Sequence, residues 1–138
     1  MGNIVGRILT SIGALGTSVV PYLADWNKQH NFGPGFSAHA RLHATESVFT
    51  STGMGLIALW LIWKRPQQDW ATRRNVAALI PILHWGTYNL AALVPTTSVD
   101  DDERKVPRLF GVLPVNLVAQ NLIALVTAIG YWLDVRGR

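Results

Sequence analysis

The chain contains no cysteine, and charged residues make up only 14% of its 138 residues. The lack of cysteine excludes disulfides, zinc–thiolate sites, iron–sulfur clusters and thiol nucleophiles. Soluble domains carry about 25% charged residues, so this chain is poor in charge for a water-soluble protein. Hydrophobic residues make up 49% of the chain, which argues against disorder, because disordered chains combine low hydrophobicity with high charge.

Motifs that identify common soluble activities are also missing. The chain has no Walker loop, no GxGxxG, no HExxH and no GxSxG. The net charge is +4, which in a soluble protein could indicate a nucleic-acid partner. Here the positive residues lie between apolar runs, where they more often set membrane orientation. We therefore expect no nucleic-acid partner.

Four long apolar runs dominate the sequence, and each is about the length needed to cross a bilayer, roughly 20 residues. A segment inside lipid must satisfy its own backbone hydrogen bonds, so these runs should be helices. We predict an all-α, polytopic membrane protein, with one domain over residues 1–138 that forms a bundle of four transmembrane helices. The expected helices span about residues 4–24, 37–63, 74–95 and 114–135.

Lysine and arginine predict the orientation of this bundle. The side that holds both termini and the middle loop carries seven of them, and the opposite side carries five. Short cytoplasmic loops are enriched in these residues. We expect an integral protein of a bacterial inner membrane with both termini in the cytoplasm. Its first partner is the lipid bilayer, and assembly into a homo-oligomer or a larger membrane complex stays open.

The stretch between the first two apolar runs holds three of the four histidines. Ser37 is a plausible N-cap for the second helix. On that helix His39, His43 and Glu46 are spaced i, i+4 and i+7, so they share one face. Glu46 lies nine residues past Ser37, about 13 Å below the outer end of the helix.

Polar residues of the third and fourth helices reach similar depths. By residue count, His84 lies about 16 Å below the outer end of its predicted helix, and Gln120 lies roughly 9 Å below the end of the fourth. Tyr88 shares a face with His84. Ionisable residues inside a membrane are costly and usually mark function, so we predict a polar chamber in the outer half of the bundle. Further residues expected to border it are Tyr22, Asp25, Asn27, Asn89 and Asn116.

One chemical interpretation of the chamber is acid–base catalysis on a lipophilic small molecule, as in isomerases, cyclases or hydrolases. Removal from water favours the neutral forms of a carboxylic acid and an imidazole, so two such groups can exchange protons with a substrate. Glu46 and His84 would form the acid–base pair, with Asp25 and Tyr88 as further catalytic groups. The expected substrate-binding residues are Tyr22, Asn27, Asn89, Asn116 and Gln120.

Two other chemistries and one non-catalytic role stay open. His39 and His43, with His30, could bind zinc or non-haem iron. A haem held between His43 and His84 is less favoured, because their expected depths differ. Alternatively the protein is a membrane accessory subunit, or a module that binds a ligand or an ion, and the polar residues then hold helices or subunits together.

The segments Asp25-Trp26-Asn27-x-x-His30 and His39-Ala40-Arg41-x-His43 resemble a family of small four-helix integral membrane proteins with a DWNxxH…HARxH signature. The likeness covers roughly residues 16–63, with Leu42 where that family has Phe. The family has no assigned activity, so the resemblance implies architecture. The group-level candidates it implies are Asp25, Asn27, His30, His39, Arg41 and His43.

A looser likeness, in architecture and residue types only, connects the chain to sterol-isomerase (emopamil-binding) and membrane terpene-cyclase bundles. Those proteins place carboxylate, histidine and amide groups deep in the membrane and act on apolar substrates. None of their motifs aligns with this sequence, so the likeness implies a class of substrate and no residue roles.

Overall fold

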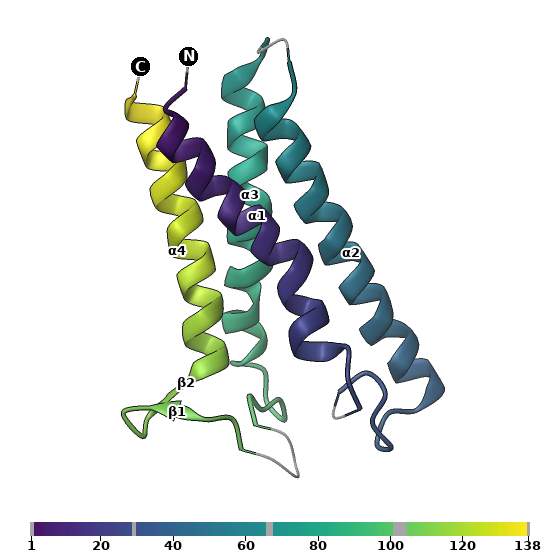
Figure 1. Ribbon diagram of the computed structural model, residues 1–138. Coiled ribbons are helices and arrows are strands. Elements are labelled where there is room, and N and C mark those ends of the chain that lie inside the picture. Colours follow the sequence, from purple (N-terminus) through teal and green to yellow (C-terminus); the bar gives the residue numbers. More distant parts are fainter. Residues whose placement is uncertain (1, 29, 66–67, 101–104, 138) are drawn as a thin grey trace.

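The computed structural model describes residues 2–28, 30–65, 68–100 and 105–137, and it is an all-α bundle of four helices (Figure 1). The helices are α1 (Ile4–Asp25), α2 (Ala38–Trp63), α3 (Trp70–Ala91) and α4 (Val115–Arg136). A short antiparallel hairpin, β1 (Arg108–Leu109) and β2 (Leu113–Pro114), precedes α4. Its turn places Phe110 and Gly111 at positive φ, 52° and 72°.

Helix ends follow local capping. The side chain of Asn3 accepts from the amides of the first turn of α1, and Ser37 Oγ accepts from Ala40 N at the start of α2. The third helix runs over residues 70–91 instead of the expected 74–95. At its far end Thr97 Oγ1 donates to the carbonyl of Ala91 (2.7 Å), so the chain turns there although its sequence is still apolar.

The helices α1 and α3 each pack against the other three, while α2 packs against α1 and α3. Both termini and the α2–α3 turn lie at one end of the bundle, called here the terminal end (Figure 1). The α1–α2 and α3–α4 connections lie at the opposite end, called the loop end.

Small residues make the closest helix contacts. A Cβ added to Gly130 of α4 would lie 2.6 Å from the backbone nitrogen of Thr10 in α1, and one added to Gly6 would lie 2.5 Å from the Gly130 carbonyl. A Cβ on Gly55 of α2 would lie 2.5 Å from the carbonyl of Ala14. Close approach through small residues is how membrane helices pack without a hydrophobic driving force between them.

Large apolar side chains point outward instead. On α1 they recur at helical spacing, and α3 and α4 have similar outward stripes, while the buried side chains are mostly small or polar. This distribution reverses that of a soluble domain and indicates a membrane protein. The outward stripes consist of Ile8, Ile12, Leu15 and Val19 on α1, Val76, Leu79 and Leu83 on α3, and Leu122, Leu125, Ile129 and Trp132 on α4.

Among the described residues, three helices are long and apolar enough to cross a membrane, α1, α2 and α4. This count is one fewer than the sequence interpretation gave. The helix α3 falls short because Arg73, Arg74 and Asn75 occupy its first turns and His84 and Asn89 follow. Because α3 packs against all three other helices, some of these polar side chains can lie against protein instead of lipid.

The terminal end is filled by aromatic and cationic side chains. The Arg7 guanidinium donates to the carbonyl of Ile62 (2.6 Å) and lies over the rings of Trp63 and Trp70, 4.6 and 4.8 Å from their centroids. Trp63 Nε1 in turn donates to Ser11 Oγ at 3.0 Å. These contacts connect the start of α1 with the end of α2 and the start of α3.

A buried ion pair lies at the same end. Arg74 Nε of α3 is 4.0 Å from Asp134 Oδ2 of α4, and the Asp134 residue is only 1% exposed. The guanidinium also lies 5.4 Å from the centre of the Tyr131 ring. At this separation the opposite charges attract each other without a direct hydrogen bond, and neither Asp134 oxygen has a hydrogen-bond partner among the described residues.

Candidate functional site: a polar cavity at the loop end

A cavity of about 680 Å³ opens between the helices at the loop end. Its floor contains Pro21 of α1, Ser51 of α2 and Trp85 of α3, and residues 98–100 and 105–107 supply one wall. Several of the residues singled out in the sequence line it together, although they come from different helices and one connection. These residues are Asp25, His30, His84, Tyr88, Asn116 and Gln120.

His84 lies on α3, seven residues before its last residue and thus about 10 Å from the loop end of that helix. Its ring meets the edge of the Trp85 ring, with centroids 4.8 Å apart. Trp85 Nε1 donates to the buried Thr17 Oγ1 (3.1 Å), which fixes this part of α3 against α1. Among the described residues, the His84 imidazole has no hydrogen-bond partner, so its ring nitrogens are available to an occupant of the cavity.

Asp25 and His30 lie at the mouth of the cavity and are close enough to interact electrostatically. The turn that joins them is built by Asn27. Its Oδ1 accepts from His30 N (3.1 Å), and its Nδ2 donates to the carbonyl of Ala24 (2.7 Å). The amide of Asn31 closes the turn on the carbonyl of Asp25 at 3.1 Å. Asn27 therefore shapes the mouth without lining it.

Amide and phenol groups occupy the side between α3 and α4. Asn116 Nδ2 donates to Tyr88 Oη at 3.4 Å and to the carbonyl of Val99 at 3.3 Å. The side-chain oxygen of Gln120, Oε1, is buried and has no hydrogen-bond partner among the described residues. An occupant with a hydroxyl or an amide could satisfy that acceptor.

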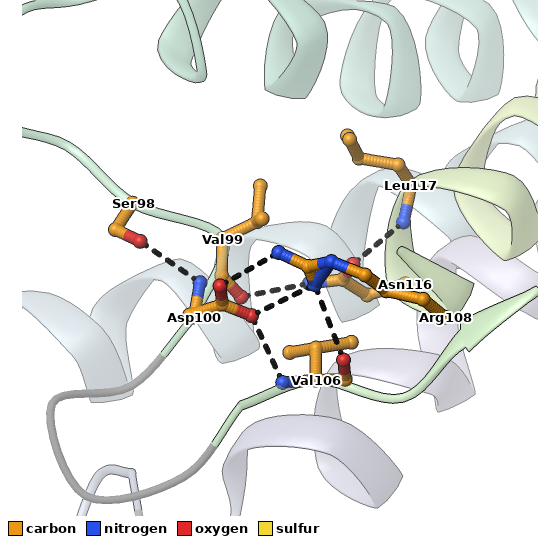
Figure 2. Close-up of polar contacts among 7 residues, drawn as sticks. All are labelled: Ser98, Val99, Asp100, Val106, Arg108, Asn116 and Leu117. Carbon is orange, nitrogen blue, oxygen red and sulfur yellow. Dashed lines mark hydrogen bonds and ion pairs between the residues drawn. The ribbon is translucent and has the colours of Figure 1, made fainter. Parts of the chain in front are cut away.

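The cavity wall from the α3–α4 connection is held by Asp100 (Figure 2). Its carboxylate forms an ion pair with Arg108, Oδ2 to Nη2 at 2.8 Å, and accepts from Val106 N at 2.9 Å. Its own amide donates to Ser98 Oγ at 3.0 Å. Sequence reasoning missed this role. The available signal was an acidic and a basic residue eight positions apart in one loop, which is too common to be specific.

Glu46 does not face the cavity, contrary to the expectation from the sequence. It is exposed on α2, where Oε1 accepts from Thr50 Oγ1 at 2.6 Å. The buried face of α2 is on the other side of the helix and contains Val48, Ser51 and Gly55. Helical spacing shows which residues share a face but not where that face points. The expected pairing of Glu46 with His84 is therefore not formed.

The three histidines of the expected metal site are not brought together. His30 lines the cavity, whereas His39 and His43 are exposed on α2, with Nε2 atoms 3.2 Å apart. Within residues 2–28, 30–65, 68–100 and 105–137, no three His, Asp or Glu residues form a group that could hold a metal ion. His43 and His84 likewise do not face a common space in which a haem could be held.

Two further residues expected to bind substrate make packing contacts instead. The Tyr22 ring lies tilted at 49° against the Trp26 ring, with centroids 5.6 Å apart, and Trp26 meets Phe32 edge-on at 5.1 Å. Asn89 and Asn121 exchange amide hydrogen bonds of 3.1 and 3.0 Å between α3 and α4. Neither Tyr22 nor Asn89 lines the main cavity.

Arg41, the arginine of the HARxH segment, donates from Nη2 to the carbonyl of Gly33 (3.5 Å) and so joins the start of α2 to the α1–α2 connection.

The sequence pattern of a family of unknown function, DUF6640, matches residues 9–138. The chain belongs to this family. No curated protein and no solved structure matches the chain. The DUF6640 match includes all the cavity residues and supports the expected membership of an uncharacterised family, and it carries no statement about activity.

Proposed function

We propose that this DUF6640 protein crosses a membrane four times with both termini in the cytoplasm. The apolar outward stripe of α3 supports the fourth span, since a polar environment would leave Val76, Leu79 and Leu83 in water. At the terminal end Lys64 and Arg136 lie over exposed tryptophans, each 4.3 Å from a ring centroid. Tryptophan with lysine or arginine is typical of a membrane interface.

Single-cysteine labelling tests this topology, because the chain has no cysteine of its own. Gly35→Cys lies at the loop end, where an added Cβ meets nothing within 4 Å. Gln68→Cys lies at the terminal end and is also exposed. A membrane-impermeant maleimide added outside intact cells should label Gly35→Cys alone. Labelling of Gln68→Cys alone would invert the orientation, and labelling of both from outside would contradict the span by α2, which separates the two positions. A third variant tests the fourth span: Val112→Cys, exposed in the turn before α4, should also be labelled from outside, and protection like that of Gln68→Cys would show that α3 does not cross.

The bundle, we infer, is a small membrane enzyme that holds a lipophilic molecule in the loop-end cavity and acts on it by acid–base chemistry. The observation that carries this proposal is the convergence of an acid, two histidines, a phenol and two amides on one cavity inside an apolar bundle. Its volume of about 680 Å³ suits a small molecule, since ligand sites commonly measure roughly 300–1,000 Å³.

The proposed roles follow from depth and partners. His84, within the span and without a protein hydrogen bond, would exchange a proton with the reacting carbon or oxygen. Asp25, which lines the mouth with His30, would take or return the second proton. Tyr88, Asn116 and the Gln120 oxygen would orient a polar group of the substrate. This chemistry is similar in kind to that of the sterol-isomerase and terpene-cyclase bundles, and the Asp25–His84 pair replaces the pair expected from the sequence.

Deuterium transfer tests the catalytic proposal without a known substrate. The purified protein is reconstituted with a total membrane lipid extract in deuterated water, and the lipids are compared by mass spectrometry. The wild type should place deuterium at carbon in a defined lipid species, and His84→Ala and Asp25→Asn should lose this. Asn89→Ala, which alters a packing contact outside the cavity, is the matched control and should keep it.

Lack of deuterium transfer by the wild type would contradict an isomerase or cyclase. If the same sample still retains one lipid species that His84→Ala releases, the cavity belongs to a non-catalytic ligand-binding module. That is the second candidate function, and the unsatisfied Gln120 acceptor in the same cavity favours it.

A further inference from the structure

The outward face of α2 is apolar toward its end, with Leu56, Ile57 and Trp60 exposed, but its first half carries ionisable side chains. His39, His43, Glu46 and Thr50 are all exposed on it, spaced i, i+4, i+7 and i+11. They form one straight stripe, called here the α2 polar stripe. The buried residues of α2 lie on the opposite side, where it packs against α1 and α3. No described part of the chain therefore covers the polar stripe.

This stripe is costly if α2 faces lipid. Glu46 lies eight residues into α2, about 12 Å from its first residue along the helix. The carboxylate bonds to Thr50 of its own helix, at 2.6 Å. Ionisable side chains within membrane spans almost always face a bundle interior or a partner group, because lipid offers no hydrogen bonds. The outward stripes of α1 and α4 follow that rule, and both are apolar.

We propose that the α2 polar stripe binds the same stripe of a second copy of this chain, in a two-fold dimer. This inference rests on the proposed membrane span of α2. Two copies inserted in the same way have parallel α2 helices, and about a two-fold axis each residue faces itself and its neighbours one turn away. His43 of one copy then lies beside Glu46 of the other. An imidazole donor and a carboxylate acceptor one turn apart make the stripe self-complementary.

The lower part of the same face allows close approach. Gly53 lies three residues past Thr50 on the stripe, and a Cβ added to it would meet nothing within 4 Å. A glycine in that position lets a facing helix come near, as in other close membrane helix pairs. Donor–acceptor self-complementarity together with this opening favours a second copy over an unrelated protein, whose groups would have to match the stripe independently.

Disulfide trapping tests the dimer directly in membranes. Gly53→Cys places the only thiol of the chain on the stripe, in open space. Mild oxidation should convert it to a covalent dimer at least roughly tenfold faster than Ile12→Cys on α1 or Leu125→Cys on α4. Those control positions are similarly exposed, 50% and 53%, but lie on apolar faces. Equal rates at all three positions would overturn the proposal.

Mass measurement of the purified full-length protein in lipid nanodiscs tests the role of the polar groups. The wild type should be a dimer, and Glu46→Leu should raise the monomer–dimer dissociation constant roughly tenfold, as expected for loss of interhelical hydrogen bonds. Glu46→Gln keeps an acceptor and should restore most of the affinity. A monomeric wild type would overturn the proposal and point to another membrane protein as the partner of α2. Failure of the membrane proposal itself would instead show in the topology labelling.

Discussion

The two ends of the bundle place their polar residues in different surroundings. At the terminal end, Arg7 donates to a backbone carbonyl and lies over two tryptophan rings, and Arg74 pairs with Asp134. At the loop end, His84 and the Gln120 oxygen have no protein hydrogen bond among the described residues and face a cavity of about 680 Å³. The same four helices thus pack closely at one end and leave an open cavity at the other.

The largest effect on stability is expected from breaking the buried ion pair between Arg74 and Asp134 at the terminal end. Asp134→Leu removes the carboxylate and leaves the buried Arg74 without an opposite charge. We expect the free energy of unfolding to fall by about 3–5 kcal/mol, the usual result of breaking a buried pair from one side. Denaturant titration in detergent micelles measures it. The double variant Asp134→Leu/Arg74→Met should recover most of the loss, and no recovery would contradict the pairing.

A smaller loss is expected where α1 and α4 touch. Gly130→Ala places a methyl group 2.6 Å from the backbone nitrogen of Thr10, which cannot move independently of α1. Overpacking of this kind costs about 1–3 kcal/mol. Gly86→Ala is the matched control, since its Cβ meets nothing within 4 Å, and it should be neutral or slightly stabilising. Thermal unfolding that ranks the two variants equally would contradict the close helix contact.

At the open end, loss of the Asp100 carboxylate should affect binding more than stability. Asp100→Asn weakens the ion pair with Arg108 that holds the wall formed by residues 98–100 and 105–107. Both side chains are partly exposed, so we expect only about 1 kcal/mol of destabilisation. A lipid that co-purifies with the wild type should dissociate faster from the variant. An unchanged dissociation rate would show that this wall does not retain the occupant.

The smallest effect on stability is expected from His84→Ala. The imidazole makes no hydrogen bond within the described protein, and its ring is only half buried, so unfolding should change by less than about 1 kcal/mol. Turnover or ligand retention should nevertheless be lost. A large loss of stability with retained binding would reverse the contrast between the two ends and make His84 a structural residue.

The sequence was sufficient for the helices and for part of the cavity. Counting residues along apolar runs placed His84 and Gln120 at related depths, and both line the cavity. The depth of His84 was overestimated, because Thr97 and the turn after Ala91 end α3 before the apolar run ends. The spacing between two residues along a helix can be counted from the sequence, but the residue at which the helix ends, from which depth is measured, depends on the fold.

Direction around a helix was harder to predict. The face that Glu46 shares with two histidines predicts that it lines the chamber, but in the structure that face points away from the bundle. The buried side of α2 contains the small residues Ser51, Gly55 and Ala58 beside Val48 and Ile62, and small residues are less conspicuous in a sequence. In a membrane protein small residues mark the interior better than polar ones. Asp100 was missed because its role depends on a loop conformation that spacing does not encode.

Photolabelling with a lipid probe shows whether the loop-end cavity binds a lipophilic molecule. The wild-type protein in membranes is irradiated with a diazirine-bearing fatty acid or a diazirine-bearing sterol, and labelled residues are mapped by mass spectrometry. If the cavity is the site, the labels concentrate on residues that line it, such as Val20, Ala24 and Tyr88. An excess of the same fatty acid or sterol without the diazirine should then reduce this labelling. Labelling confined to outward residues such as Leu15 and Leu125, without competition, would contradict the claim.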